Sequence, residues 1–210
     1  MGSVNNAQNG FKSDVKLMRM KPMTDKDIKD YCKNCDVEPP AMKFKCPECA
    51  HNPDKEQIIL DACCGSRMFH FDKVNPNVVF MDNRDFEDTL CDGRQLKVHP
   101  DIVADFRNIP FADKSFNLVI FDPPHLLKVG ESSWLCKKYG KLSKTWPTDI
   151  KKGFDECMRV LKPNGTLIFK WATRDITLKQ ILDVIKTHPI IFHKNNNTFF
   201  LVFMKGINNG

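Results

Sequence analysis

One stretch of the chain has residue types that could activate an aromatic amine: Asp122-Pro123-Pro124-His125. It follows an apolar, strand-like run at residues 116 to 121, which predicts a loop at the end of a strand. The exocyclic amine of a nucleobase is a poor nucleophile because its lone pair is delocalised into the ring. The Asp122 carboxylate and the Pro123 carbonyl could both accept hydrogen bonds from that amine and localise its lone pair toward an incoming methyl group. The prolines stiffen the loop, and the flat His125 ring could stack on the base.

The same tetrapeptide is equally compatible with an ordinary strand-ending turn, so its context decides between the two. Three earlier apolar runs each end in an acid: Asp61, Asp82 and Asp105. A turn of small residues, 62 to 66, follows the first acid, and in nucleotide-binding α/β sheets such a turn lets the backbone approach a cofactor closely. The second acid is then suited to accept both ribose hydroxyls of an adenosyl cofactor, and the third could accept from the adenine amine.

In this order the segments resemble class I S-adenosylmethionine-dependent methyltransferases, over about residues 56 to 205. Residues 61 to 66 are similar to the Asp-Pro-Phe-Cys-Gly-Ser-Gly cofactor motif of amino-methyltransferases that act on nucleic acids. Residues 122 to 125 resemble their (Asp/Asn/Ser)-Pro-Pro-(Tyr/Phe/Trp) catalytic motif. Residues 105 to 121 and 158 to 167 resemble, respectively, the pattern between the third and fourth strands and the helix-turn-strand of the fifth strand.

The resemblance implies an α/β, Rossmann-like sheet that is mostly parallel with its last strand antiparallel, S-adenosyl-L-methionine as cofactor, and a set of site residues. The implied catalytic residues are Asp122, Pro123, Pro124 and His125, and the implied cofactor-binding residues are Asp61, Cys63, Gly65, Asp82, Asn83, Asp105 and Phe106. Two positions depart from the motifs. Arg67 stands where the cofactor motif has its second glycine, and His125 stands where the catalytic motif has its stacking aromatic, which leaves the substrate base open.

Apolar periodicity predicts seven strands, at about residues 57 to 61, 77 to 82, 101 to 105, 116 to 121, 165 to 171, 189 to 193 and 198 to 204. It predicts two helices, at residues 148 to 161 and 176 to 186. Three asparagines, residues 195 to 197, predict a hairpin between the last two strands. The connections between the first three strands are short, which predicts a pared-down version of the fold with no separate target-recognition domain.

Four cysteines form a CxxC-x10-CxxC pattern: Cys32, Cys35, Cys46 and Cys49. Each CxxC can present two thiolates to one tetrahedral zinc ion, and the alternative is a set of free thiols. A closed four-cysteine site is structural and would give a short segment a reason to fold. We therefore expect three parts: residues 1–24, disordered or loosely attached; a zinc-ribbon segment, residues 25–55; and a methyltransferase domain, residues 56–210.

The positive charge is concentrated next to the catalytic motif. Residues 126 to 152 contain seven lysines and two acids, and so hold five of the chain's six net positive charges. Basic residues interleaved with aromatic ones suit a polyanion whose base is held out of its stack, whereas the alternative is a solvated lysine face. The first interpretation predicts substrate-binding roles for Trp134, Lys137, Lys138 and Tyr139.

The combined prediction is methyl transfer from S-adenosylmethionine to an exocyclic amine of a nucleobase in DNA or RNA. Two alternatives stay open: a small-molecule methyltransferase, favoured by the missing recognition domain and by His125, and a binding module that keeps the fold without turnover. The chain has no apolar run of the ~20 residues that a membrane span needs and no apolar segment behind a basic amino terminus, so we expect a cytoplasmic protein without a membrane partner.

Overall fold

The computed structural model describes residues 58–207. They belong to the second of two units into which the chain divides, Met1–His51 and Asn52–Gly210. The expected segments 1–24 and 25–55, and with them the four cysteines of the CxxC pair, lie outside the described residues.

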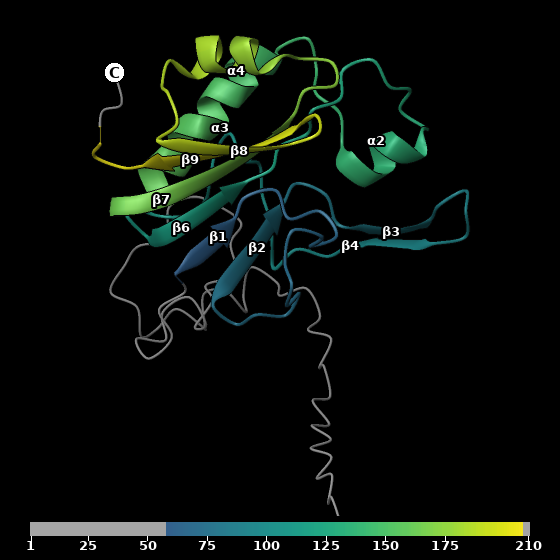
Figure 1. Ribbon diagram of the computed structural model, residues 1–210. Helices are drawn as coiled ribbons and strands as arrows, with labels where there is room; N and C mark the ends of the chain where they lie inside the picture. The colour runs from purple at the N-terminus through teal and green to yellow at the C-terminus, as the bar shows by residue number, and fades with distance from the viewer. Residues whose placement is uncertain (1–57, 208–210) are drawn as a thin grey trace, which may run out of the picture. The chain divides into compact units, whose positions relative to one another are not determined.

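A seven-stranded sheet runs through the described part of the chain in the order β5-β2-β1-β6-β7-β9-β8 (Figure 1). The strands are β1 (Ile59–Asp61), β2 (Val78–Asp82), β5 (Ile102–Val103), β6 (Phe116–Phe121), β7 (Leu161–Ala172), β8 (Ile191–Asn195) and β9 (Thr198–Met204). Neighbours from β5 to β7 pair in parallel, and only β9 runs against its neighbours β7 and β8. The expected mostly parallel sheet with an antiparallel last strand is confirmed.

The strands at the centre form because apolar runs must be covered on both faces of a parallel sheet. All five residues of β2 are buried, as is typical of such strands. β9 returns beside β8 through a tight turn in which Asn196 has φ 51, a left-handed conformation that asparagine tolerates better than most residues. The predicted hairpin at the three asparagines is confirmed.

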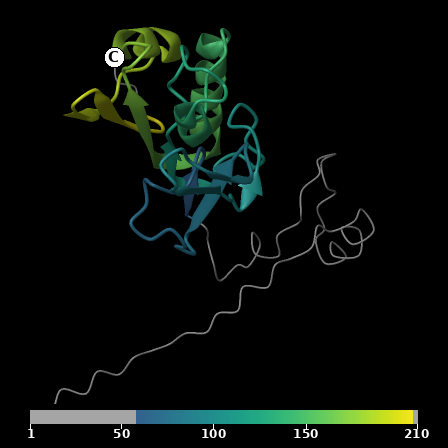
Figure 2. The ribbon, with the colours of Figure 1, turned by 90° about the vertical axis from the view of Figure 1, so that its right-hand side faces the viewer.

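Two helices cover one face of the sheet (Figures 1 and 2). They are α3 (Trp146–Val160), which has a proline in its first turn, and α4 (Leu178–Ile185), which begins with a capping box between Thr177 and Gln180. Their apolar faces join the strands in one core, to which the helices contribute Ile150, Phe154, Cys157, Val160, Ile181 and Ile185. Both helices lie within two residues of the predicted bounds.

Two elements were not predicted: a separate hairpin, β3 (Phe86–Thr89) and β4 (Gln95–Val98), and a short helix, α2 (Trp134–Tyr139). The hairpin has a small core of its own, formed by Leu90, Leu96 and Val98. Between β1, β2 and β5 the structure has turns and this hairpin but no helix, in keeping with the pared-down fold. None of the helices in the described residues has both the length and the apolar character that crossing a membrane requires.

Candidate active site

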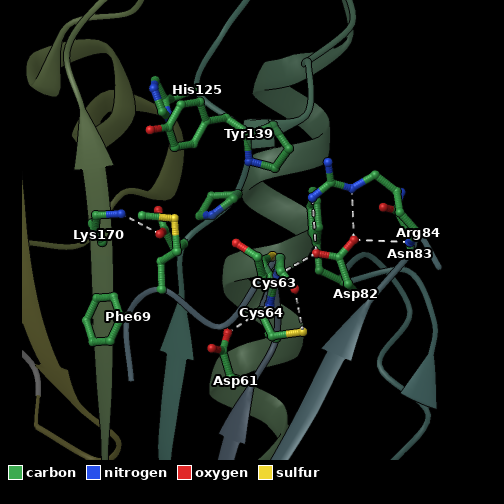
Figure 3. Close-up of a pocket in the computed structure, with 18 of the residues that line it drawn as sticks. Asp61, Cys63, Cys64, Phe69, Asp82, Asn83, Arg84, His125, Tyr139 and Lys170 are labelled. Carbon is green, nitrogen blue, oxygen red and sulfur yellow. Dashed lines mark hydrogen bonds and ion pairs between the residues drawn. The ribbon is translucent and has the colours of Figure 1, made fainter. Parts of the chain in front are cut away.

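A cavity of about 480 Å³ opens where β1, β2 and β6 end, and it has the size of an ordinary small-molecule site. The carboxyl ends of parallel strands meet at one edge of a sheet, so the residues that follow each strand converge there. Figure 3 shows Asp82 and Arg84 on one side of the cavity, Lys170 on the opposite side, and His125 with Tyr139 over its far end.

Asp61 ends β1 at the floor of the cavity and is 1% exposed. Its carboxylate accepts a hydrogen bond from the Cys63 backbone N–H at 3.2 Å and lies 2.7 Å from His70 Nε2. Burial raises the pKa of this carboxyl group, and the contact with His70 opposes that rise. Because both contacts join Asp61 to residues of the segment that follows β1, its carboxylate holds that turn in place beside the cavity.

The turn after β1 contains two residues in the left-handed conformation. Gly65 has φ 49, and Arg67, at the position of the expected second glycine, has φ 56. The strained Arg67 backbone is stabilised through its side chain, which stacks 3.9 Å above the Phe80 ring centroid and donates to Asp101 at 2.9 Å. Cys63 in the same turn lines the cavity, and burial raises the pKa of its thiol well above its usual value, which favours the protonated form.

Asp82 ends β2 with its side chain 5% exposed, and its carboxylate lines the cavity. It accepts hydrogen bonds from the Gly65 backbone N–H at 2.9 Å and from the backbone and side chain of Arg84. Asn83 and Gly65 also line the cavity. A carboxylate beside a close-approaching backbone turn fits the hydroxyls of a ribose, so these residues fit an adenosyl cofactor.

The expectation that Asp105 lies near an adenine is not supported by its position, because Asp105 is absent from the cavity lining. Arg107 binds its carboxylate with Nη2 at 2.5 Å, and the same guanidinium donates to Asp149 in α3 at 3.0 Å. Arg107 therefore ties Asp105 to Asp149 of α3. Its neighbour Phe106 does line the cavity, edge-on to Phe121 at 5.4 Å between ring centroids.

All four residues of the tetrapeptide after β6, Asp122 to His125, line the cavity. Asp122 Oδ2 lies 2.5 Å from the Lys170 Nζ of β7. The two side chains meet because β6 and β7 pair in parallel with Phe121 opposite Phe169, which places the following residues next to each other. Burial raises the pKa of Asp122, and the Lys170 charge lowers it again. Lys170 therefore favours the ionised carboxylate, the form that accepts hydrogen bonds.

Removing this cation should move the acid limb of the activity profile. Without Lys170, burial is unopposed, the pKa of Asp122 rises further, and the carboxylate takes up its proton at a higher pH. In Lys170→Met we expect the rise of kcat with pH to occur at higher pH than in the wild type, with cofactor affinity unchanged. The limb should disappear in Lys170→Met combined with Asp122→Asn, which has no carboxyl to titrate. An identical profile in wild type and Lys170→Met would rule out this role.

His125 lies in the cavity as a neutral ring. Burial, aided by the nearby charges of Lys170 and Arg174, lowers the pKa of His125 to about 4, so it carries no charge near neutral pH. Its ring centroid lies 5.9 Å from that of Tyr139 and 6.4 Å from that of Trp171. A neutral imidazole among aromatic rings is suited to contact with a flat, uncharged substrate group.

The structure separates the four residues predicted for substrate binding. Lys138 and Tyr139 line the main cavity, whereas Trp134 and Lys137 line a second, smaller one of about 260 Å³ between α2 and the turn of the β3–β4 hairpin. Lys137 Nζ lies 2.6 Å from Asp88 Oδ2 in β3. This ion pair therefore joins α2 to the hairpin.

Four lining residues were not predicted from the sequence: Met68, Phe69, Arg84 and Phe200. Lys170 also lines the cavity, as its place near the end of a predicted strand indicates, because ligands bind at that edge of the sheet. No sequence pattern indicates Phe69 and Phe200, since they come together only through the packing of the turn after β1 against β9, with ring centroids 6.0 Å apart. Among residues 58–207 no group of three or more potential ligands could hold a metal ion.

No protein-family model matches the chain. Over 80 residues it is 30% identical to a malonyl-[acyl-carrier protein] O-methyltransferase of Coxiella burnetii, a stretch covering 38% of this chain and 21% of that protein. The chain therefore spans about a fifth of that relative's length.

Two solved structures have a similar arrangement. The PH0226 protein of Pyrococcus horikoshii matches with a TM-score of 0.47 and 19% identity, over 70% of this chain and 81% of that one. A SAM-dependent methyltransferase of Methanosarcina mazei matches with a TM-score of 0.40 and 13% identity, over 70% and 91%. At these scores neither match assigns an activity. The seven-stranded α/β sheet, in which only β9 runs against its neighbours, is the Rossmann-like arrangement that the sequence resemblance implied.

Proposed function

We propose that this chain is an S-adenosylmethionine-dependent methyltransferase that methylates an exocyclic amine of a nucleobase in DNA or RNA. The observation that carries the proposal is that Asp82 and Asp122 line one cavity. One carboxylate is suited to a ribose and the other to an amine, and they come from the ends of β2 and β6, the two strands that flank β1 in the same sheet. A cofactor and a substrate amine could therefore meet between them.

In this proposal Asp82, Asn83 and the Gly65 backbone hold the cofactor, and Phe106 contacts it from the adjoining wall. The cofactor supplies an electrophilic methyl group. Asp122 and the Pro123 carbonyl accept hydrogen bonds from the target amine, while the neutral His125 ring contacts the base. These bonds strengthen as the nitrogen gains positive charge, so they stabilise the transition state more than the bound substrate. The nitrogen–carbon bond forms as the sulfur–carbon bond breaks, and the amine proton leaves for solvent afterwards, because only then is it acidic.

The nucleic-acid part of the proposal rests on the basic segment beside the cavity. Lys138 lines the cavity, whereas Lys137 is paired with Asp88. We expect Lys138→Glu to weaken nucleic-acid binding and to flatten its salt dependence by about one unit of slope, since one phosphate contact is lost, with cofactor affinity unchanged. Binding measured across a series of salt concentrations checks this.

Lys152→Glu is the matched control for that experiment. Lys152 belongs to the same basic segment but is exposed on α3 and does not line the cavity, so its reversal should have the smaller effect. Equal effects of the two substitutions would mean that the segment acts only through its total charge. No effect of either would remove the support for a polyanionic substrate.

A second candidate is methyl transfer to a small acidic molecule, and Lys170 is the observation that favours it. A lysine ammonium group in the cavity could bind a substrate carboxylate, although here it already contacts Asp122. The O-methyltransferase of Coxiella burnetii, by its name, modifies a malonyl group, and the likeness covers a fifth of that protein. The two candidates differ in the atom that is methylated: an amine nitrogen in one, a carboxylate oxygen in the other.

We also propose that the CxxC pair holds one structural zinc ion per chain, because the four cysteines supply a complete tetrahedral thiolate set. Metal analysis of the purified full chain should find one zinc, and Cys32→Ser combined with Cys46→Ser should lose it. Full zinc occupancy in that double variant would show that the ligands lie elsewhere. The control is Cys91→Ser, which removes an exposed cysteine outside the pattern.

A further inference from the structure

Arg84 joins the cofactor side of the cavity to its substrate side. Its Nε donates to Asp82 Oδ1 at 3.0 Å and its Nη2 to Asp82 Oδ2 at 3.3 Å, so the guanidinium forks the carboxylate. Its remaining terminal nitrogen, Nη1, donates to the Lys137 carbonyl of α2 at 3.0 Å (Figure 3 shows the contacts with Asp82). One side chain thus holds both the acid suited to a ribose and the helix that carries Lys138 and Tyr139.

The hydrogen bonds to Asp82 account for its whole accepting capacity. Oδ1 accepts from the Arg84 backbone N–H and from Nε, while Oδ2 accepts from the Gly65 N–H and from Nη2. A carboxylate offers about four lone-pair sites. Two ribose hydroxyls can bind Asp82 well only if donors leave it. The backbone donors are fixed by the turn, so the Arg84 side chain is the donor that can move.

The helix at the other end of Arg84 is weakly held. α2 has six residues and none of them is buried. Within the described residues, side-chain contacts join it to the hairpin region through Arg84 and through Lys137 with Asp88. The helix ends at Gly140, where an added Cβ would lie 2.9 Å from Pro124 Cγ, so its end packs directly on the catalytic loop. A shift of α2 would therefore move Tyr139 and displace the loop that holds Asp122.

We infer that Arg84 is a positioning residue that couples the two halves of the site: the cofactor ribose displaces its guanidinium from Asp82 and thereby loosens its bond to α2. This inference rests on the proposed cofactor site. Arg84 competes with the ribose for the Asp82 carboxylate, so cofactor binding releases α2, the helix that carries Lys138 and Tyr139. The position of α2 can then adjust to the substrate.

The first test is the cofactor affinity of Arg84→Gln, measured by calorimetry with S-adenosylhomocysteine or S-adenosylmethionine. A competitor has been removed, so the affinity should increase by about tenfold, the equivalent of about 1.4 kcal/mol, although thermal stability falls. A merely structural arginine would give the opposite sign, because its loss would loosen the site. Unchanged or weaker affinity in a folded Arg84→Gln would overturn the inference.

Arg107→Gln is the matched control. Arg107 forks Asp105 from two residues away, as Arg84 forks Asp82, and it also bridges to a helix, but that carboxylate does not line the cavity. We expect this variant to lose stability with no gain in cofactor affinity. A comparable gain in both variants would mean that the effect comes from lost positive charge in general.

The second test uses the wild type and does not depend on a variant that folds. Amide hydrogen exchange of residues 134 to 139 should become faster when the cofactor is bound, because the Arg84 bond to α2 is weakened. Unchanged or slower exchange there would contradict the inference. If the wild-type protein bound no cofactor at all, the proposed function would fail; if it bound cofactor without these effects, only the role of Arg84 would fail.

Discussion

Asp122→Ala should lower kcat about 100-fold or more while leaving cofactor affinity close to that of the wild type. The substitution removes an acceptor whose bond to the amine strengthens in the transition state, and losses of single transition-state hydrogen bonds are of this size. Asp122 is hydrogen-bonded to Lys170 and not to Asp82, Asn83 or Gly65, so its loss should leave cofactor affinity unchanged. Single-turnover kinetics together with calorimetry separate the two effects.

Asp122→Asn is the conservative partner of that variant. The amide keeps one acceptor oxygen for the amine, so we expect it to retain more activity than Asp122→Ala, with no acid limb from this residue in its pH profile. Turnover of Asp122→Ala at the wild-type rate on its true substrate would refute the proposed mechanism. Equal losses in both variants would show that the charge paired with Lys170, and not an acceptor oxygen, is what matters.

Asp82→Ala should weaken cofactor binding by about 2 kcal/mol, or roughly 30-fold. Two charge-assisted hydrogen bonds to a ribose could contribute more, but in the free protein the carboxylate is already bonded to Arg84, which reduces the net gain. Calorimetry on the purified variant checks the value. Wild-type affinity in Asp82→Ala would show that the ribose binds elsewhere.

Asp105→Ala serves as the control for Asp82→Ala. Asp82 ends β2 and Asp105 lies two residues beyond β5, and each is forked by an arginine two residues later, yet only Asp82 lines the cavity. Asp105→Ala should therefore leave cofactor affinity unchanged. A loss of affinity equal to that of Asp82→Ala would restore the expectation, drawn from the sequence, that Asp105 lies near the adenine.

The sheet was predictable because its central strands are apolar runs that end in acids or prolines. Residues 78 to 82 are all buried, and a continuous apolar run of this length is typical of a central strand in a parallel sheet. The hairpin and α2 were missed for the opposite reason. Residues 86 to 89 and 95 to 98 alternate over four positions with charged side chains, and α2 buries nothing. The position of α2 depends on contacts such as Arg84 with the Lys137 carbonyl, which join residues far apart in sequence.

The site was predictable to the extent that strand ends define it. The tetrapeptide at residues 122 to 125 and the acid Asp82 lie where the strand pattern puts them. The sequence does not distinguish Asp105 from Asp82, because the difference lies in a contact from Arg107 to α3. Nor does it reveal that Asp122 is paired, since that depends on the register between β6 and β7.

The most direct test of the central claim is to incubate the full chain with methyl-labelled S-adenosylmethionine and, separately, with DNA, RNA and a pool of small metabolites, followed by digestion and nucleoside analysis. We predict label on the exocyclic nitrogen of one nucleoside from DNA or RNA, and its loss with Asp122→Ala. Label recovered only in a small carboxylic acid, or in no pool at all, would contradict methylation of a nucleobase amine.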